Sequence, residues 1–287
     1  MVLSLVVLLA FGAMLAWGVG DFFIQRTVRK MGDVETLGLI GAIGSLALLP
    51  FVIGDIMDLS GRGLSFLVIV GIFTFLIGML NMTALRKGKL SIVEVVLTIE
   101  LPVTLVLGLL LFREYFSFMQ LTFIILSFLG IALTAMKTYP PHLLNQFERG
   151  IGLALVTAIG YGFIDYFTAY SSRTFSPLLA IWLPWTVFAL ICIGIIMQRR
   201  DITHFFYKVS TYKRLVLITA LIDVLAWVLY SISLSLHHLV LVTAITESYP
   251  AVAIFLDRAY NKTHVKMHQY IGAAIALVAS ILLALTL

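Results

Sequence analysis

Six acidic residues lie inside long apolar stretches of the sequence, and their chemistry is its most informative feature. They are Asp21, Glu94, Glu100, Asp165, Asp223 and Glu247. No lysine or arginine lies deep in any of these stretches. An ionised aspartate at the centre of a membrane helix costs roughly 2.5–3.5 kcal/mol. Each of these groups must therefore be protonated, hydrated in a cavity, or paired with a cation that the chain does not supply.

The missing positive partner indicates the kind of ligand that such a protein would handle. A proton, a cation or a substrate amine would each neutralise these acids. The pattern therefore favours a transporter linked to protons or cations, or one whose substrates carry amines. It argues against phosphorylated substrates, because these would need arginine or lysine in the binding cavity.

Two of the acids, Glu100 and Glu247, lie near the middle of their apolar stretches and close to prolines. Glu100 is two residues before Pro102, and Glu247 is three residues before Pro250. A proline removes a backbone hydrogen bond one turn earlier and can open a helix there. A freed carbonyl beside an acid would suit a proton or cation. The alternative is a protonated carboxyl group that hydrogen-bonds between helices. Asp223 is equally deep and joins the candidate substrate or proton site.

Asp21 and Asp165 lie nearer the ends of their stretches and occupy equivalent places. They are candidates for a symmetric gate or coupling pair in the same site. The alternative is that each anchors a helix end, for example Asp21 with Arg26 and Asp165 with Arg173. Glu94 is close enough to a helix start to reach water.

Aromatic residues near these acids are candidates for cavity lining. Trp17 and Tyr161 occupy equivalent positions, and Trp227 and Tyr230 lie one turn apart. Asp223 lies one turn before Trp227 on the same predicted helix face. Such rings would suit amphipathic or cationic substrates. The alternative is that they face lipid or the membrane interface.

The composition shows what kind of element must position these residues. Of 287 residues, 61% are apolar and 11% are charged, whereas soluble domains have about 45–50% apolar and about 25% charged residues. This excludes a soluble globular, disordered or collagen-like chain. The net charge of +5 does not suggest nucleic acid, because basic residues of membrane proteins gather in cytoplasmic loops. The lone Cys192 can form no internal disulfide.

The apolar stretches predict an all-α integral membrane protein with ten transmembrane helices. A spanning helix needs about 20 mostly apolar residues, and the continuous runs do not alternate as barrel strands do. We interpret the first stretch as a helix and not as a signal peptide. His237-His238 is either a tight turn between two helices or part of one long helix. The predicted spans are 2–25, 34–54, 64–85, 90–112, 117–136, 150–171, 177–197, 214–236, 239–257 and 268–287.

Loop charges predict the orientation. Sixteen lysines and arginines fall in one set of alternate loops and three in the other. The positive-inside rule places the basic set in the cytoplasm and both termini outside. We expect a multi-pass protein of the plasma membrane.

The two halves of the chain repeat the same order of features. A shift of 144 residues aligns Trp17 with Tyr161 and Asp21 with Asp165, and a later shift of 148 aligns Pro102 with Pro250. This predicts a first repeat over residues 1–140 and a second over 150–287. Because five helices are an odd number, the second repeat would be inverted in the membrane, as in many secondary transporters. The alternative is a duplicated scaffold without transport.

Several short motifs resemble the EamA-type drug/metabolite transporter superfamily. They are Trp17-Gly18, Asn81-x-x-Ala84-Leu85, Pro102 and the Arg113-Glu114 turn. The resemblance covers essentially the whole chain. It implies a cavity surrounded by helices 1–4 and 6–9, with helices 5 and 10 peripheral. Asn81 is then a candidate for the cavity wall, and Glu114 is expected to cap helix 5. The second repeat departs from the pattern with Lys262 where an acid is expected, and relatives often have cytoplasmic termini.

These observations predict a secondary transporter of small metabolites, such as amino acids or amine-bearing compounds. We expect a monomeric exporter that works by alternating access in a lipid bilayer, coupled to protons or cations. The alternative is a lipid flippase or a non-transporting scaffold of the same fold. No catalytic motif is present, so we predict no enzyme activity, cofactor or metal.

Overall fold

A computed structural model of the protein describes residues 2–87, 93, 96–135, 151–199, 202–249, 252 and 266–286. Within these residues every regular element is a helix. The elements are α1 (Val2–Met31), α2 (Asp33–Met57), α3 (Gly61–Lys87), α5 (Glu100–Leu111), α6 (Phe118–Ala135), α7 (Ile151–Thr174), α8 (Leu179–Gln198), α9 (Ile202–Leu236), α10 (Leu239–Thr246) and α12 (Met267–Ala284).

Seven helices in the described part of the chain are long and apolar enough to cross a membrane. They are α1, α2, α3, α7, α8, α9 and α12, and α5 and α6 are shorter apolar helices. The expectation of an all-helical membrane fold is therefore confirmed. The number of ten spans remains a prediction.

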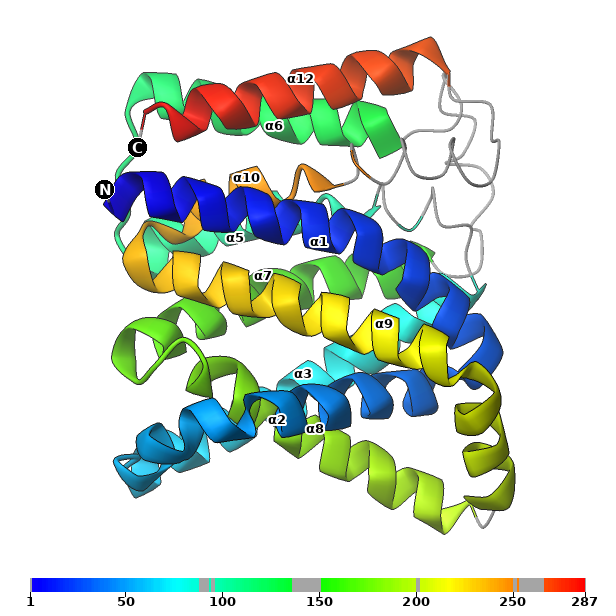
Figure 1. The fold of residues 1–287 in the computed structure, drawn as a ribbon. Helices are drawn as coiled ribbons and strands as arrows, with labels where there is room; N and C mark the ends of the chain where they lie inside the picture. Colours follow the sequence, from blue (N-terminus) through cyan, green and yellow to red (C-terminus); the bar gives the residue numbers. More distant parts are fainter. Residues whose placement is uncertain are drawn as a thin grey trace.

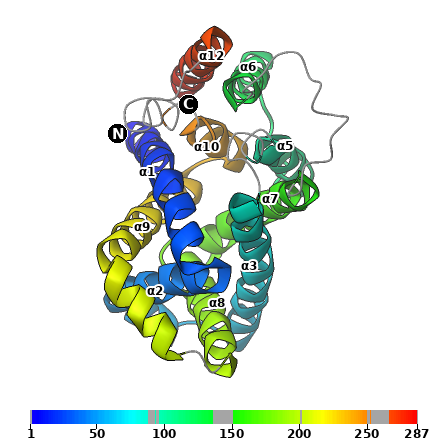
Figure 2. The same ribbon diagram turned by 90° about the vertical axis from the view of Figure 1, so that its right-hand side faces the viewer.

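The helices lie side by side in a bundle, with both chain termini at the same end (Figure 1). The view along the bundle shows α6 and α12 as a pair at one edge, where α10 contacts both of them (Figure 2). The remaining helices pack around one another, with α1 against α9, α2 against α8, and α3 against α7 and α8. The chain thus separates a central group of helices from one peripheral pair.

Three glycines on one face of α2 allow α8 to approach closely. A Cβ atom on Gly41 would lie 2.2 Å from the Phe188 ring, and one on Gly44 would lie 2.5 Å from the Trp185 ring. Gly38 faces Cys192 in the same way. Small residues commonly serve this purpose in membrane helices. Here they position two aromatic rings of α8 at the centre of the bundle.

The eighth predicted span differs from the observed helix. We predicted 214–236, but α9 begins at Ile202 and has a kink at Tyr212, where φ is −107° and ψ is 17°. The predicted span begins two residues after this kink, where the continuously apolar part of α9 starts. The first part mixes apolar and polar residues, and Phe205 packs against the core. His237 and His238 form the turn between α9 and α10.

Neither predicted helix near the prolines is continuous. Within the predicted span 90–112, Thr98 and Ile99 form a turn and α5 begins at Glu100. Pro102 then lies in the first turn of α5, where its missing N–H costs least. Within 239–257, α10 already ends at Thr246. Pro250 lies outside the described residues, so its predicted role as a helix break stays a prediction.

Candidate functional site

A cavity of about 120 Å³ lies among the central helices. Its walls come from α1, α2, α3, α5, α7, α8, α9 and the turn after α10. The side chains that line it combine aromatic, apolar and acidic groups. They belong to Trp17, Asp21, Ile24, Leu37, Ile40, Thr74, Gly78, Asn81, Met82, Leu85, Leu97, Glu100, Tyr161, Ile164, Asp165, Trp185, Phe188, Asp223, Trp227, Glu247 and Tyr249.

Five of the six acids singled out in the sequence line this one cavity. They are Asp21, Glu100, Asp165, Asp223 and Glu247, and Glu94 lies outside the described residues. Every charged side chain in the described lining is therefore a carboxyl group. Their placement together is a geometric finding, and their role in binding stays a prediction.

The acids at the first end of the cavity, which we call the Glu100 end, are Glu100, Asp165 and Glu247. Glu100 lies within range of electrostatic repulsion from the other two and within hydrogen-bonding reach of Asp165. The Thr104 hydroxyl donates to Asp165 Oδ2 at 3.2 Å. Two carboxyl groups within hydrogen-bonding reach of each other are suited to share a proton.

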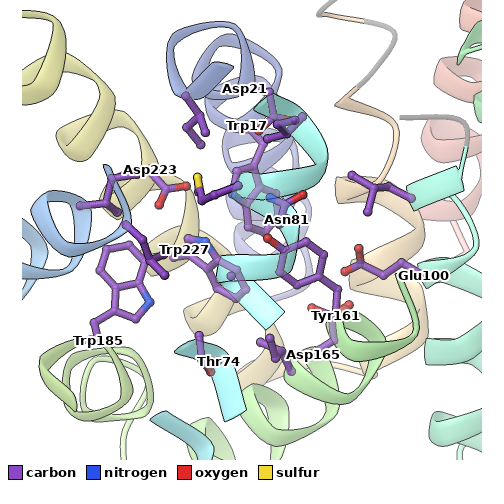
Figure 3. Close-up of a pocket in the computed structure, with 18 of the residues that line it drawn as sticks. Trp17, Asp21, Thr74, Asn81, Glu100, Tyr161, Asp165, Trp185, Asp223 and Trp227 are labelled. Carbon is purple, nitrogen blue, oxygen red and sulfur yellow. The ribbon is translucent and has the colours of Figure 1, made fainter. Parts of the chain in front are cut away.

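The second end, which we call the Asp223 end, combines one acid with tryptophans. Asp223 lies within hydrogen-bonding reach of the Trp17 indole. The Trp17 ring meets the Trp227 ring edge to face at 5.3 Å between centroids, and Trp185 lies beside them (Figure 3). Asp21 is within electrostatic range of both Asp223 and Glu100. The cavity thus has a carboxyl-rich end and an aromatic end.

Asn81 and Tyr161 lie between these two ends (Figure 3). Tyr161 is within hydrogen-bonding reach of Asn81 and within electrostatic range of Glu100, Asp21 and Asp223. Asn81 is 8% exposed. Its Oδ1 atom is buried and has no hydrogen-bond partner. An unsatisfied buried carbonyl costs free energy, so this atom is available to a donor brought by a ligand.

The predicted lining residues are placed as follows. Trp17, Asn81, Tyr161 and Trp227 line the cavity. Tyr230 lies behind the wall instead: it is 1% exposed, packs on Trp17 and shares a hydrogen bond of 2.6 Å with the Thr243 hydroxyl.

Sequence reasoning missed several wall residues. Thr74, Met82 and Phe188 were not among the predicted lining residues, yet all three line the cavity. Tyr249 lies within hydrogen-bonding reach of Asp21. Its position between Glu247 and Pro250 is the one signal that would have suggested it.

The interactions that we considered for Asp165 and Glu114 differ from those in the structure. Arg173 binds the carbonyl oxygens of Leu234 at 2.9 Å and His237 at 2.6 Å, and it lies 3.5 Å from Glu114. It does not hold Asp165, which points into the cavity. We expected Glu114 to cap the helix that follows it in the chain. It caps α10 instead, because its carboxylate accepts hydrogen bonds from the first two backbone amides of α10.

Comparison with known proteins identifies the family of this chain. The sequence matches the EamA-like transporter family twice, over residues 4–136 and 148–285. The chain belongs to the EamA-like transporter family. The resemblance seen in the sequence is therefore confirmed, and membership makes the protein a multi-pass membrane protein of a family that transports small molecules.

A solved structure titled "Crystal structure of protein" has a similar fold. It has a TM-score of 0.70 and 14% sequence identity, and the match covers 98% of both chains. At this identity the likeness shows the fold alone. The comparison with curated proteins gave no match.

Proposed function

We propose that this EamA-family protein is a proton-linked secondary transporter of small amine-bearing metabolites, amino acids among them. The observation that carries the proposal is that one cavity brings together five ionisable side chains in its described lining that are all carboxylic acids. A substrate amine neutralises one or more of them, and protons neutralise them when the substrate has left. Binding of proton and substrate to the same groups would couple their movements.

The packing of the helices supports alternating access by two inverted repeats. We match the helices of the two halves in chain order: α1, α2, α3, α5 and α6 of the first half with α7, α8, α9, α10 and α12 of the second. The main contacts between the halves then have equivalent contacts in which the two halves have changed places. The contact of α1 with α9 corresponds to that of α7 with α3, and α5 with α7 to α10 with α1. The pairs α2–α8 and α6–α12 correspond to themselves. This is the pattern of a two-fold axis, and the axis would lie in the membrane plane.

The Glu100 end is the proposed proton site. Glu100 and Asp165 lie within hydrogen-bonding reach, and Glu100 lies at the start of α5 beside the turn at Thr98 and Ile99. The loop charges support an orientation with both termini outside, and we propose the plasma membrane as the location. We propose a monomer that exports its substrate from the cytoplasm.

Transport in proteoliposomes tests the proposal. The purified protein should move amine-bearing metabolites, and an imposed pH gradient should change the initial rate. Glu100→Gln together with Glu247→Gln should abolish the effect of pH. Glu35→Gln is the control, because Glu35 pairs with Arg199 at 3.2 Å outside the cavity lining.

Two results would contradict the proposal. Undiminished pH dependence in the double variant would remove the proton site from these acids. Movement of fluorescent lipids between leaflets, without any movement of metabolites, would identify the alternative flippase function.

A further inference from the structure

We propose that the cavity selects short aliphatic diamines, which carry an ammonium group at each end and no carboxylate. The inference rests on the proposed transport function and narrows its substrate class. One ammonium would lie at the Asp223 end and the other at the Glu100 end, with the alkyl chain passing Asn81 and Tyr161.

The arrangement of acids at two ends favours two positive charges over one. Asp223 and Glu100 lie on opposite sides of Tyr161 in the cavity (Figure 3). Asp21 is within electrostatic range of both, so the negative charge is spread along the cavity. A ligand with a single ammonium could neutralise one end only. A diamine would give both ends a charge-assisted hydrogen bond.

The Asp223 end has the composition of an organic ammonium site. Trp17, Trp185 and Trp227 surround the acid (Figure 3). A cation over a tryptophan face is attracted by the ring quadrupole, and the CH₂ groups beside the ammonium pack on the same rings. A small hydrated metal ion would gain little from such walls, whereas an alkylammonium gains from both interactions.

Asn81 provides evidence for a ligand that is independent of the acids. Its Oδ1 atom is buried without a partner while the side chain lines the cavity. Ammonium groups donate hydrogen bonds and accept none. An ammonium group has three N–H donors, so one that binds a carboxyl group at either end of the cavity keeps a donor for this oxygen, which lies between the two ends.

Size and charge limit the length of the ligand. The cavity of about 120 Å³ is slightly smaller than an engineered protein cavity of about 150 Å³ that binds benzene, so about six non-hydrogen atoms fit. Diaminobutane with terminal amines has this size. A carboxylate on the ligand would face a wall whose charged groups are all acids, so amino acids should bind less well.

Three probes that differ by one group test the inference. Terminal diaminobutane is compared with butylamine, which lacks one amine, and with ornithine, which adds a carboxylate to the diamine. Binding to the purified full chain is measured by isothermal titration and by the shift in thermal unfolding. We expect diaminobutane to bind about tenfold or more tightly than either analogue, since each adds or removes a charge in a low-dielectric cavity.

Variants show whether the preference arises in the cavity. Asp223→Asn should reduce the affinity for diaminobutane to about that of the unchanged protein for butylamine. Asp58→Asn is the matched control, because Asp58 is exposed at the end of α2, and it should change neither affinity. Asn81→Leu, which removes the free oxygen, should weaken diaminobutane more than butylamine.

The outcomes separate this inference from the proposed function. If butylamine binds as tightly as diaminobutane, or ornithine binds more tightly, the diamine assignment is wrong. The proposed transport function would still hold if a pH gradient drives transport of those amines. If none of the three probes binds, the diamine assignment fails. The transport proposal fails only if a metabolite mixture also produces no pH-dependent flux in proteoliposomes.

Discussion

Glu114 binds Leu239 across the two halves of the chain. The Glu114 Oε1 atom accepts a hydrogen bond from the Leu239 backbone amide at 2.6 Å, and Oε2 accepts one from Val240 at 3.1 Å. Both amides belong to the first turn of α10, where backbone N–H groups have no partner within the helix. Glu114 is 4% exposed, and Arg173 lies 3.5 Å away. A residue of the first half therefore fixes the start of the short helix that leads to Glu247.

Replacing Glu114 should destabilise the protein. In Glu114→Gln the amide has one acceptor oxygen, so one of the two α10 amides is left buried without a partner. We expect a loss of about 1–3 kcal/mol, measured as a lower midpoint of thermal unfolding in detergent. Glu35→Gln is the control, because its ion pair involves Arg199, a half-exposed side chain, and should cost about 1 kcal/mol or less. Equal midpoints for the two variants would show that the cap does not stabilise the fold.

The α6–α12 pair should respond strongly to one added methyl group. A Cβ atom on Gly130 would lie 2.5 Å from the Ala276 backbone nitrogen, which cannot move without displacing α12. We expect Gly130→Ala to cost about 1–3 kcal/mol through overpacking. None of the described lining residues comes from α6 or α12, so ligand affinity should change little in the folded fraction.

Gly194→Ala is the matched substitution for this test. Nothing lies within 4 Å of its added Cβ atom. A glycine-to-alanine change inside a helix without steric conflict is expected to stabilise by about 0.4–1 kcal/mol. If Gly130→Ala raises the unfolding midpoint as Gly194→Ala does, the two helices do not pack as closely as described.

The sequence was sufficient to predict the elements whose position depends on hydrophobicity alone. The bounds of α2, α3 and α8 agree with the predicted spans to within a few residues, because a helix in lipid must be apolar along its whole length. The acids Asp21 and Asp165 were found by the same logic, since a carboxyl group in an apolar stretch needs a special environment.

Features that depend on contacts between distant residues could not be predicted. The role of Glu114 depends on the position of α10, which follows it by more than a hundred residues. Phe188 reaches the cavity because Gly41 on α2 leaves room for its ring. The break before Glu100 is different, because the sequence predicted an opening one turn before Pro102 and the turn lies there, at Thr98 and Ile99.

His237 should contribute to the pH dependence of stability. Burial, with His238 and then Arg173 as weaker contributions of the same sign, lowers its pKa below the ordinary value of 6.5, and Glu114 opposes the shift. A folded-state pKa below the unfolded one means that the stabilising contribution is present above pH 6.5 and is lost as the pH falls through the folded pKa.

We therefore expect His237→Asn to lose less stability than the unchanged protein when the pH falls from 7 to 5 (roughly the window in which a histidine titrates). The measurement is the difference in unfolding midpoint between the two pH values. His204→Asn is the control, because His204 is exposed on α9. If both variants show the pH dependence of the unchanged protein, His237 does not contribute to it.

The orientation in the membrane can be tested by labelling two exposed serines. Ser60 follows α2 and Ser210 lies in the first part of α9. Five predicted spans separate them, so they should face opposite sides, and the loop charges place Ser60 outside. Cys192 is fully buried, and Cys192→Ser provides a background without a native thiol.

In that background, Ser60→Cys should react with a membrane-impermeant maleimide on intact cells. Ser210→Cys should react only after permeabilisation, because Lys208, Lys213 and Arg214 mark its segment as cytoplasmic. The opposite pattern would reverse the proposed orientation but keep the odd number of spans between the two sites. Labelling of both serines from outside would contradict that odd number, and with it the inverted relation of the two halves.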